Sequence, residues 1–133
     1  MSDTEGQSLL TPASFHILLA LADRERYGYA IQQEIANMTE GRLKLGPGTL
    51  YRTLNQLLAA GWVEEAGDQV SDSPRREYRR YYRLTSAGRE VARAEALRLA
   101  RLAQQARLRG LIEDGGIVGG AGSPPPKLAG GLP

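Results

Sequence analysis

The stretch Leu45–Leu57, with the sequence LGPGTLYRTLNQL, carries the clearest helix signal in the chain. Pro47 suits the first position of a helix, where the N–H that proline lacks would have no partner inside the helix. Leucines recur from there at helical spacing, and Gly61 suits the left-handed residue that ends a helix. We therefore predict an amphipathic helix that begins at Pro47 and ends just before Gly61.

The side of this helix opposite the leucines is polar but carries little charge. Solvated helix faces favour Glu and Lys, so this composition is unusual. Its residues are small or have short hydrogen-bonding groups: Gly48, Thr49, Arg52, Asn55, Gln56 and Ala59, with Tyr51 on the flank. In the major groove of DNA, Arg pairs with guanine, and Asn or Gln pairs with adenine. From the pattern alone, a base-reading face and an ordinary solvated face are both open.

Two shorter helices are predicted before this one. Thr11 suits an N-cap, and apolar residues at helical spacing extend the first helix to about Leu21. A charged connector over residues 23–26 leads to a second helix that begins near Gly28, and the sequence of residues 39–41 is typical of its end. Two short helices, a turn with Gly and a third helix make a helix-turn-helix core.

The segment that follows the third helix has the pattern of a β-hairpin. Residues 62–65 give a short strand signal, residues 67–74 are a polar loop, and residues 78–84 form an aromatic-rich second strand. Consecutive side chains on a strand point to opposite faces, so we expect one of Tyr81 and Tyr82 to lie in the core. The hairpin is the wing of a winged helix.

A long helix is predicted after the hairpin, with Thr85 as its N-cap and its end at about Arg109. Apolar residues along it follow a 4-3-4-3 spacing, which is typical of a seam between helices. The seam residues are Ala92, Ala96, Leu99, Ala103 and Ala106. This seam is too apolar to leave in water and too thin for a second core, so we predict that the helix forms a homodimer.

The predicted fold is mainly α with a small β-hairpin: a winged helix-turn-helix followed by one long C-terminal helix. From Asp114 onward, 11 of 20 residues are Gly or Pro, a composition that cannot offset the entropy cost of ordering. The expected divisions are a flexible N-terminus over 1–10, a winged helix-turn-helix domain over 11–84, a dimerisation helix over 85–113 and a disordered tail over 114–133.

The composition also restricts the function classes. The chain has 133 residues and no cysteine, which excludes disulfides and thiolate chemistry. His16 is the only histidine and has no metal-ligand or nucleophile partner nearby in sequence, so we expect a structural role. These features predict neither an enzyme nor a metal or cofactor site. No apolar run approaches transmembrane length and no signal pattern opens the chain, which favours a cytoplasmic protein.

The net charge of +2 conceals a strong segregation. Residues 1–74 have a net charge of −5, residues 75–109 of +8 and residues 110–133 of −1. Fifteen of the seventeen basic residues are Arg, whose parallel donors match phosphate oxygens. Such a basic segment is typical of a protein that binds a polyanion. The wing residues predicted to contact phosphates are Arg75, Arg76 and Arg79, and Lys44 is a weaker candidate.

The run Gly46–Tyr51, Gly-Pro-Gly-Thr-Leu-Tyr, resembles the recognition-helix signature of the phenolic-acid decarboxylase regulator (PadR) family of winged helix-turn-helix transcription factors. Three further matches occur in the same order: Tyr27-Gly28-Tyr29, Gly61–Glu65 and Arg80–Thr85. Together they cover roughly residues 11 to 109. The chain resembles the short branch of the family, in which a single C-terminal helix forms the dimer.

The resemblance implies a dimeric, sequence-specific DNA-binding transcriptional regulator, a repressor that recognises an inverted-repeat operator in double-stranded DNA. The residues that it implies or the pattern favours for DNA contact are Lys44, Gly48, Thr49, Tyr51, Arg52, Asn55, Gln56, Arg75, Arg76 and Arg79. A small molecule that binds near the dimer interface releases many relatives from DNA, so a small-molecule effector is a further partner to consider. No aromatic residue follows Tyr82, however, so the last helix lacks the ring-stacking platform of some relatives. The alternative is a winged-helix protein-interaction module without DNA binding.

Overall fold

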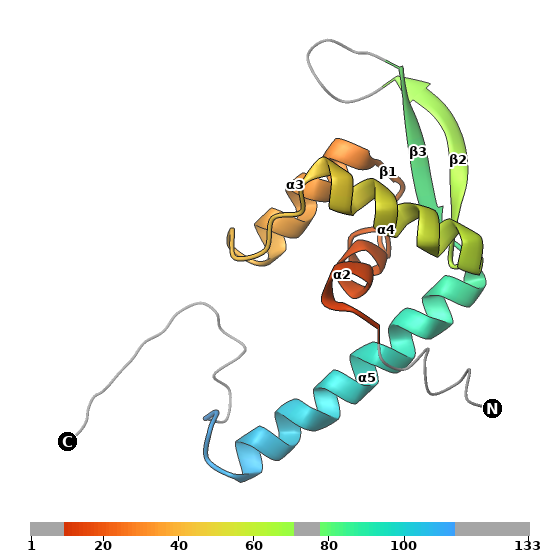
Figure 1. The fold of residues 1–133 in the computed structure, drawn as a ribbon. Coiled ribbons are helices and arrows are strands. Elements are labelled where there is room, and N and C mark those ends of the chain that lie inside the picture. The colour runs from red at the N-terminus through yellow and green to blue at the C-terminus, as the bar shows by residue number, and fades with distance from the viewer. Residues whose placement is uncertain (1–9, 71–77, 114–133) are drawn as a thin grey trace. The chain divides into compact units, whose positions relative to one another are not determined.

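The computed structural model describes residues 10–70 and 78–113. Its elements, shown in Figure 1, are α2 (Pro12–Ala20), β1 (Arg26–Tyr27), α3 (Gly28–Met38), α4 (Pro47–Ala60), β2 (Val63–Val70), β3 (Tyr78–Leu84) and α5 (Ser86–Leu108). The predicted mainly helical fold with a small antiparallel sheet is confirmed. Residues 1–9 of the predicted flexible N-terminus, the predicted disordered tail over 114–133, and Arg75 and Arg76 lie outside the described residues.

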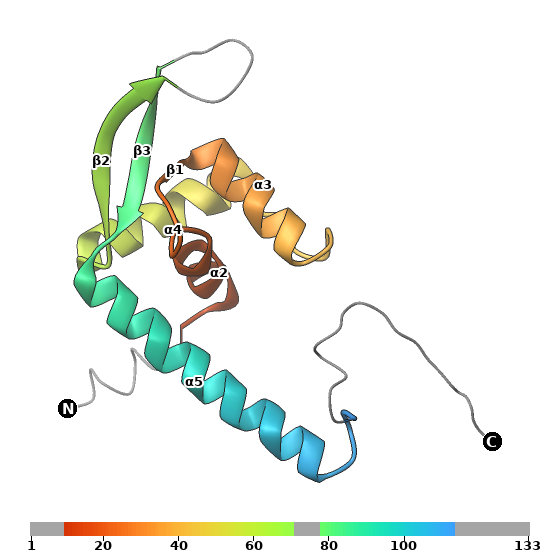
Figure 2. The same ribbon diagram turned by 180° about the vertical axis from the view of Figure 1, so that it is seen from behind.

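Contacts within the chain divide it inside α5, into a unit that ends at Ala96 and a unit that begins at Leu97. The first unit contains α2, α3, α4, the sheet and the first half of α5. Figures 1 and 2 show α2, α3 and α4 close together in this unit, with β2 and β3 extending beyond them.

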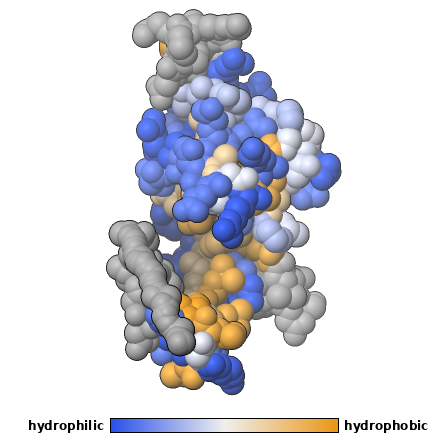
Figure 3. Space-filling view, turned by 90° about the vertical axis from the view of Figure 1, so that its left-hand side faces the viewer, coloured by the Kyte–Doolittle hydropathy of each residue, from blue (hydrophilic) through white to orange (hydrophobic). Residues whose placement is uncertain are grey.

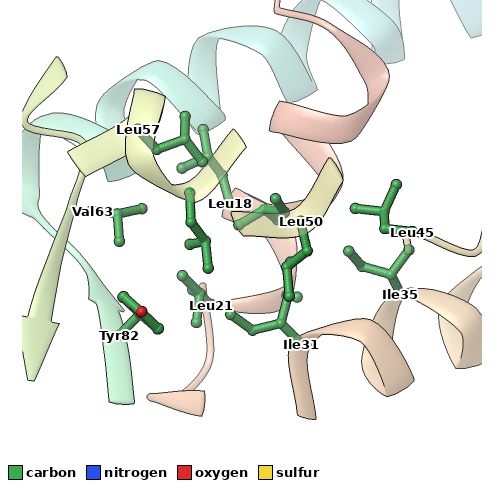
Figure 4. Close-up of a cluster of buried hydrophobic side chains, with 12 residues drawn as sticks. Leu18, Leu21, Ile31, Ile35, Leu45, Leu50, Leu57, Val63 and Tyr82 are labelled. Atoms are coloured by element: carbon green, nitrogen blue, oxygen red, sulfur yellow. The ribbon is translucent and has the colours of Figure 1, made fainter. Parts of the chain in front are cut away.

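The three helices and the sheet surround one hydrophobic core. Figure 4 shows side chains of α2, α3 and α4 that point toward a common centre, with Val63 and Tyr82 of the sheet beside them. The largest fully buried side chains are Ile17, Leu18, Ile31, Ile35, Leu50, Leu54, Leu57 and Val63. Burial of each such side chain stabilises the fold by roughly 1.5–3 kcal/mol. This core fixes the position of α4.

The helices end where short local signals in the sequence predict. The Thr11 hydroxyl oxygen accepts a hydrogen bond from the Ser14 N–H at 3.1 Å, which caps α2. Gly61 follows α4 with a φ of 81°, a left-handed conformation that glycine adopts without steric cost. The Thr85 hydroxyl oxygen accepts from the Gly88 N–H at 3.0 Å and caps α5.

The sheet has three strands, not the two of a simple hairpin. Its strand order is β1-β3-β2, and both pairs are antiparallel. Arg26 and Tyr27 pair with Tyr82 and Tyr81. The sequence predicted a charged connector over residues 23–26, and this prediction is wrong for Arg26, which belongs to β1. A two-residue strand is too short to show an alternating pattern, and the partners that define it lie far away in sequence.

Strand β2 is longer than predicted. It continues to Val70, whereas the sequence indicated a strand over 62–65 and a loop from Gly67. The pairing register shifts between Glu65 and Gly67, and Gly67 has a φ of 93°. A β-bulge with a left-handed glycine therefore lets residues with loop composition remain in the ladder.

One of Tyr81 and Tyr82 was expected in the core, and Tyr82 is that residue, but both are buried, at 7% exposure each. Tyr82 joins the hydrophobic core, and burial raises the pKa of its hydroxyl above the ordinary value. Tyr81 faces the other side of the sheet, where its ring centroid lies 5.4 Å from that of Tyr27. The strand that the sequence did not reveal explains why the second tyrosine is buried.

The start of α5 is fixed to the first unit by close backbone contact. Gly88 lies against the backbone of Trp62, whose carbonyl oxygen leaves no room for a Cβ atom at residue 88. The Arg89 guanidinium donates to the Ala22 carbonyl oxygen at 3.1 Å. Ala92, the first residue of the predicted dimer seam, is half-buried and packs against the core of its own unit.

Candidate nucleic-acid interface

Helix α4 separates a buried apolar side from an exposed polar side, as its sequence pattern predicts. Leu50, Leu54 and Leu57 are at most 2% exposed, and Thr53 is buried beside them. The exposed residues on the other side are Gly48, Tyr51, Arg52, Asn55, Gln56 and Ala59, and Thr49 is half-buried. The buried side holds the helix rigidly, and the other side presents polar groups to solvent.

The longest polar side chains of this face are free to bind a ligand. Across residues 10–70 and 78–113, no side-chain hydrogen bond or ion pair engages Arg52, Asn55 or Gln56. Such donors and acceptors can bond to the edges of DNA bases without breaking contacts inside the protein. They follow one another at helical spacing, so they share one side of α4.

The turn between α3 and α4 is held by hydrogen bonds. The Gln32 side-chain amide donates to the Leu45 carbonyl oxygen at 2.7 Å, and the Thr39 hydroxyl oxygen accepts from the Leu43 N–H at 3.1 Å. Lys44 lies in this turn and is exposed. The turn therefore fixes the angle at which α4 leaves α3, with a positive charge beside the start of α4.

Tyr51 links the exposed side of α4 to the start of α3. It is 45% exposed, and its hydroxyl lies so close to Gly28 that a Cβ atom at residue 28 would overlap it. Glycine is therefore needed at the first position of α3 for this close approach. Tyr51 packs on the rim of the domain, on the flank of the exposed face of α4.

Two arginines of the wing are paired with acidic side chains of the same domain. The Arg83 Nε atom lies 2.7 Å from a Glu64 carboxylate oxygen, and a second guanidinium nitrogen lies 3.4 Å from Glu25. The hydrogen bond with Glu64 raises the pKa of Arg83 above its ordinary value. The Arg80 guanidinium lies 3.6 Å from Glu65. All these side chains remain substantially exposed, so the pairs can exchange with an outside anion.

Arg79, one of the three wing residues predicted to contact phosphate, is exposed on β3. The central carbon of its guanidinium lies 5.9 Å from the ring centroid of Tyr27, which is within cation–π range. This contact places a positive charge beside the start of α3.

The second half of α5 carries exposed leucines. Figure 3 shows hydrophobic residues, in orange, gathered over this helix in the lower part of the view. Among the predicted seam residues, Ala96 and Leu99 are exposed, and Ala103 and Ala106 are half-buried. The other exposed leucines of α5 are Leu97, Leu102 and Leu108. Leu97 and Leu108 were not predicted, although their separation of about three helical turns was a visible signal. Exposed apolar side chains gathered on one helix are typical of interaction sites.

The remaining sequence predictions concern chemistry and membranes. Within the described ranges, no group of three or more His, Asp or Glu residues is arranged to hold a metal ion. The His16 Nδ1–H donates to the Pro12 carbonyl oxygen at 2.6 Å, which is a structural role inside α2. Of the helices that the structure describes, none combines the length and the apolar character needed to cross a bilayer.

A family model described as the transcriptional regulator PadR-like family matches residues 17–94, which is more than half of the chain. The chain belongs to the PadR-like family. The matched residues include the helix-turn-helix, the sheet and the start of α5.

Several proteins share this sequence similarity. Transcriptional regulator Rv3488 of Mycobacterium tuberculosis is 36% identical over 90 residues, which cover 68% of this chain and 78% of that protein. Uncharacterized protein X of Lysinibacillus sphaericus is 37% identical over 73 residues, which cover 55% of this chain and 64% of that protein. An uncharacterized 37.1 kDa protein in transposon TN4556 of Streptomyces fradiae is 38% identical over 90 residues, 24% of its length. The chain thus spans less than two thirds of the last two relatives.

Solved structures of PadR-like proteins have the same fold. A PadR family transcription regulator from Clostridium difficile superposes with a TM-score of 0.58 at 21% identity, covering 74% of this chain and 98% of that one. A transcriptional regulator from Clostridium thermocellum superposes with a TM-score of 0.56 at 21% identity, covering 74% of this chain and 91% of that one. Bacillus subtilis PadR, solved in complex with operator DNA, superposes with a TM-score of 0.50 at 19% identity, covering 60% of this chain and 44% of that one. The winged-helix fold of this family is therefore shared.

Proposed function

We propose that this PadR-like protein is a dimeric, sequence-specific DNA-binding protein that regulates transcription as a repressor. The observation that carries the proposal is the exposed polar face of α4. Arg52, Asn55 and Gln56 stand there on a helix fixed by its buried leucines. They make no side-chain hydrogen bond or ion pair with the described part of the chain. The same fold in Bacillus subtilis PadR, solved with operator DNA, supports the proposal.

In this proposal α4 lies in the major groove. Arg52 suits guanine, and Asn55 or Gln56 suits adenine, because these side chains match the donor and acceptor pattern of those bases. Gly48, one helical turn before Arg52, lets the backbone come close to the DNA, and Thr49 and Tyr51 lie at the edge of the same face. These contacts would carry the sequence information.

Positive side chains on either side of α4 would contact the phosphates. Lys44 lies before α4, and Arg79 lies on the wing. Arg75 and Arg76 are added from their position in the sequence alone. Contacts with phosphates fix the register of a protein on DNA but do not distinguish one base sequence from another. We therefore assign affinity to these residues and discrimination to α4.

The dimer in this proposal forms through α5. The spacing of Ala92, Ala96, Leu99, Ala103 and Ala106 and the exposure of Leu99 and Leu102 support it. A two-fold dimer presents two copies of α4 to half-sites about 34 Å apart, so the operator would be an inverted repeat. A dimer bound at a promoter would exclude the transcription machinery. A small molecule that binds at the seam would relieve repression if it favoured a dimer in which the α4 helices no longer match the half-sites.

Ala103→Glu is expected to convert the dimer to monomers in sedimentation experiments, because a seam of small residues has no room for a charged side chain. Gln104→Glu is the matched control, since it adds the same charge at the neighbouring exposed position. A dimer that persists in Ala103→Glu, or that is lost equally in both variants, would place the interface elsewhere.

The competing function is a winged-helix protein-interaction module without DNA binding. The ion pairs of Arg80 and Arg83 with acids of their own domain favour it, because they neutralise part of the wing. A salt series with duplexes selected from a randomised pool separates the two functions. We expect the logarithm of the binding constant to fall linearly with the logarithm of salt concentration. Absence of duplex binding at low salt would support the interaction module.

A further inference from the structure

Tyr29 is an exposed tyrosine near the start of α3 whose hydroxyl is held by a neighbouring side chain. The residue is 58% exposed. Gln33, one helical turn later, donates a hydrogen bond from its side-chain nitrogen to the Tyr29 hydroxyl oxygen at 3.0 Å. This bond occupies a lone pair of the oxygen, so the O–H group keeps its proton for an acceptor outside the protein.

The two residues before Tyr29 in the chain contact α4 and the wing. The preceding residue, Gly28, lies against the hydroxyl of Tyr51 on the rim of α4. The residue before that, Tyr27, lies under the guanidinium of Arg79 on the wing. Figure 1 shows the start of α3 next to β1, at the side of the sheet. Tyr29 is therefore the exposed residue that directly follows two residues in contact with Tyr51 and Arg79, which we assign to the DNA interface.

We propose that Tyr29 is a further DNA-contact residue, whose hydroxyl donates a hydrogen bond to a phosphate oxygen beside the groove that α4 enters. Gln33 is its positioning residue, because it directs the O–H group outward. The inference rests on the proposed function. Phosphate groups border a helix in the major groove, and neutral tyrosine hydroxyls are among the side-chain groups that bind them. A hydrogen bond to a charged acceptor is stronger than one between neutral groups.

Tyr29→Phe tests the contact because it removes the hydroxyl and keeps the ring. We expect DNA affinity to fall about tenfold, which corresponds to about 1.4 kcal/mol. The loss should be equal on the selected operator and on scrambled duplex, because a phosphate contact carries no sequence information. The salt slope should stay unchanged, because tyrosine contributes no positive charge and releases no counterion. Lys44→Ala, in contrast, should reduce that slope.

Gln33→Leu tests the positioning role through a double-mutant cycle. We expect it to weaken DNA binding in the wild-type background and to have no further effect in Tyr29→Phe, because its action passes through the hydroxyl. Tyr82→Phe is the matched control, since it removes a tyrosine hydroxyl from a residue only 7% exposed. Its DNA affinity should equal that of wild type, and melting curves of all variants should verify that each is folded.

The outcomes separate this inference from the proposed function. If wild type binds DNA with a steep salt dependence and Tyr29→Phe binds equally well, the Tyr29 contact is refuted and the proposed function stands. If Tyr29→Phe weakens binding to the operator alone, Tyr29 reads a base and the phosphate assignment is wrong. If wild type does not bind duplex DNA at all, the inference and the proposed function both fail.

Discussion

Helix α4 and the wing both present polar side chains to solvent, but they differ in what those side chains already contact. On α4, Arg52, Asn55 and Gln56 have no side-chain hydrogen bond or ion pair within the described ranges. On the wing, Arg80 and Arg83 are paired with Glu65 and Glu64. A ligand that binds α4 therefore breaks no internal contact, whereas an anion that binds these arginines must compete with carboxylates.

This difference suggests a division of roles between the two regions. Arg83 and Glu64 are directly opposite each other on antiparallel strands, and such cross-strand pairs stabilise the hairpin by a few tenths of a kcal/mol to about 1 kcal/mol. The arginines of β3 thus hold the wing together as well as supply charge. The α4 side chains have no such structural role, so their residue types are best explained by what they bind.

The largest effect is expected from a comparison of adjacent residues on the two sides of α4. Leu54→Ala should lower the free energy of unfolding by about 2–5 kcal/mol, because it leaves a cavity in the core. Asn55→Ala, at the next and exposed position, should change it by less than about 0.5 kcal/mol and should weaken operator binding instead. Urea unfolding and DNA titration of both variants measure these effects. A large loss of stability in Asn55→Ala would mean that the exposed face is structural.

A smaller effect is expected on the wing. Glu64→Gln removes the charge of the nearer of the two acidic partners of Arg83. It should raise the affinity for operator and scrambled duplexes alike, by about two- to threefold at low salt. Stability should change by less than about 1 kcal/mol, because the pair is half-exposed. Glu90→Gln on α5 is the control, since it makes the same change in net charge at another exposed site. An equal gain in both variants would show that net charge, and not the wing pair, limits affinity.

The smallest effect is expected for Tyr82, which lies where the wing meets the core, and it concerns the dependence of stability on pH. Burial raises the pKa of Tyr82, so the folded protein keeps this proton at a pH where the unfolded chain releases it. The contribution of Tyr82 to the free energy of unfolding is fully present below the ordinary tyrosine pKa of about 10. It is lost as pH rises through the raised pKa of the folded state. Melting temperatures between about pH 8 and 11 should therefore fall more steeply for wild type than for Tyr82→Phe. If the two plots of melting temperature against pH were parallel, Tyr82 would not contribute to the loss of stability at high pH.

The sequence predicts the helices well because their ends depend on local chemistry. Thr11 and Thr85 accept hydrogen bonds within the first turn of their helices, and Gly61 adopts the conformation expected from its residue type. The exposed face of α4 follows in the same way from helical periodicity. Strand β1 could not be predicted, since it exists only through pairing with Tyr81 and Tyr82, more than fifty residues later.

Features that depend on register were also beyond sequence reasoning. The ion pair of Arg83 with Glu64 requires the strand register, and the contact of Tyr51 with Gly28 requires the angle between two helices. The spacing of Tyr29 and Gln33 was visible in the sequence. The sequence does not show that Gly28, the residue before Tyr29, contacts Tyr51 of α4, and our proposal for their hydrogen bond depends on that contact.

The central claim, that α4 reads base sequence, is tested most directly by selection from a randomised duplex pool with wild type and Arg52→Ala. Arg101→Ala is the control, since it removes an arginine from an exposed position on α5. We expect Arg52→Ala to lose about 1–3 kcal/mol of base discrimination at one position in each half-site, with the other positions unchanged. Arg101→Ala should select the wild-type sequence. If Arg52→Ala also selects the wild-type sequence, with uniformly weaker binding, then Arg52 holds phosphate and the assignment of α4 as the reader is contradicted.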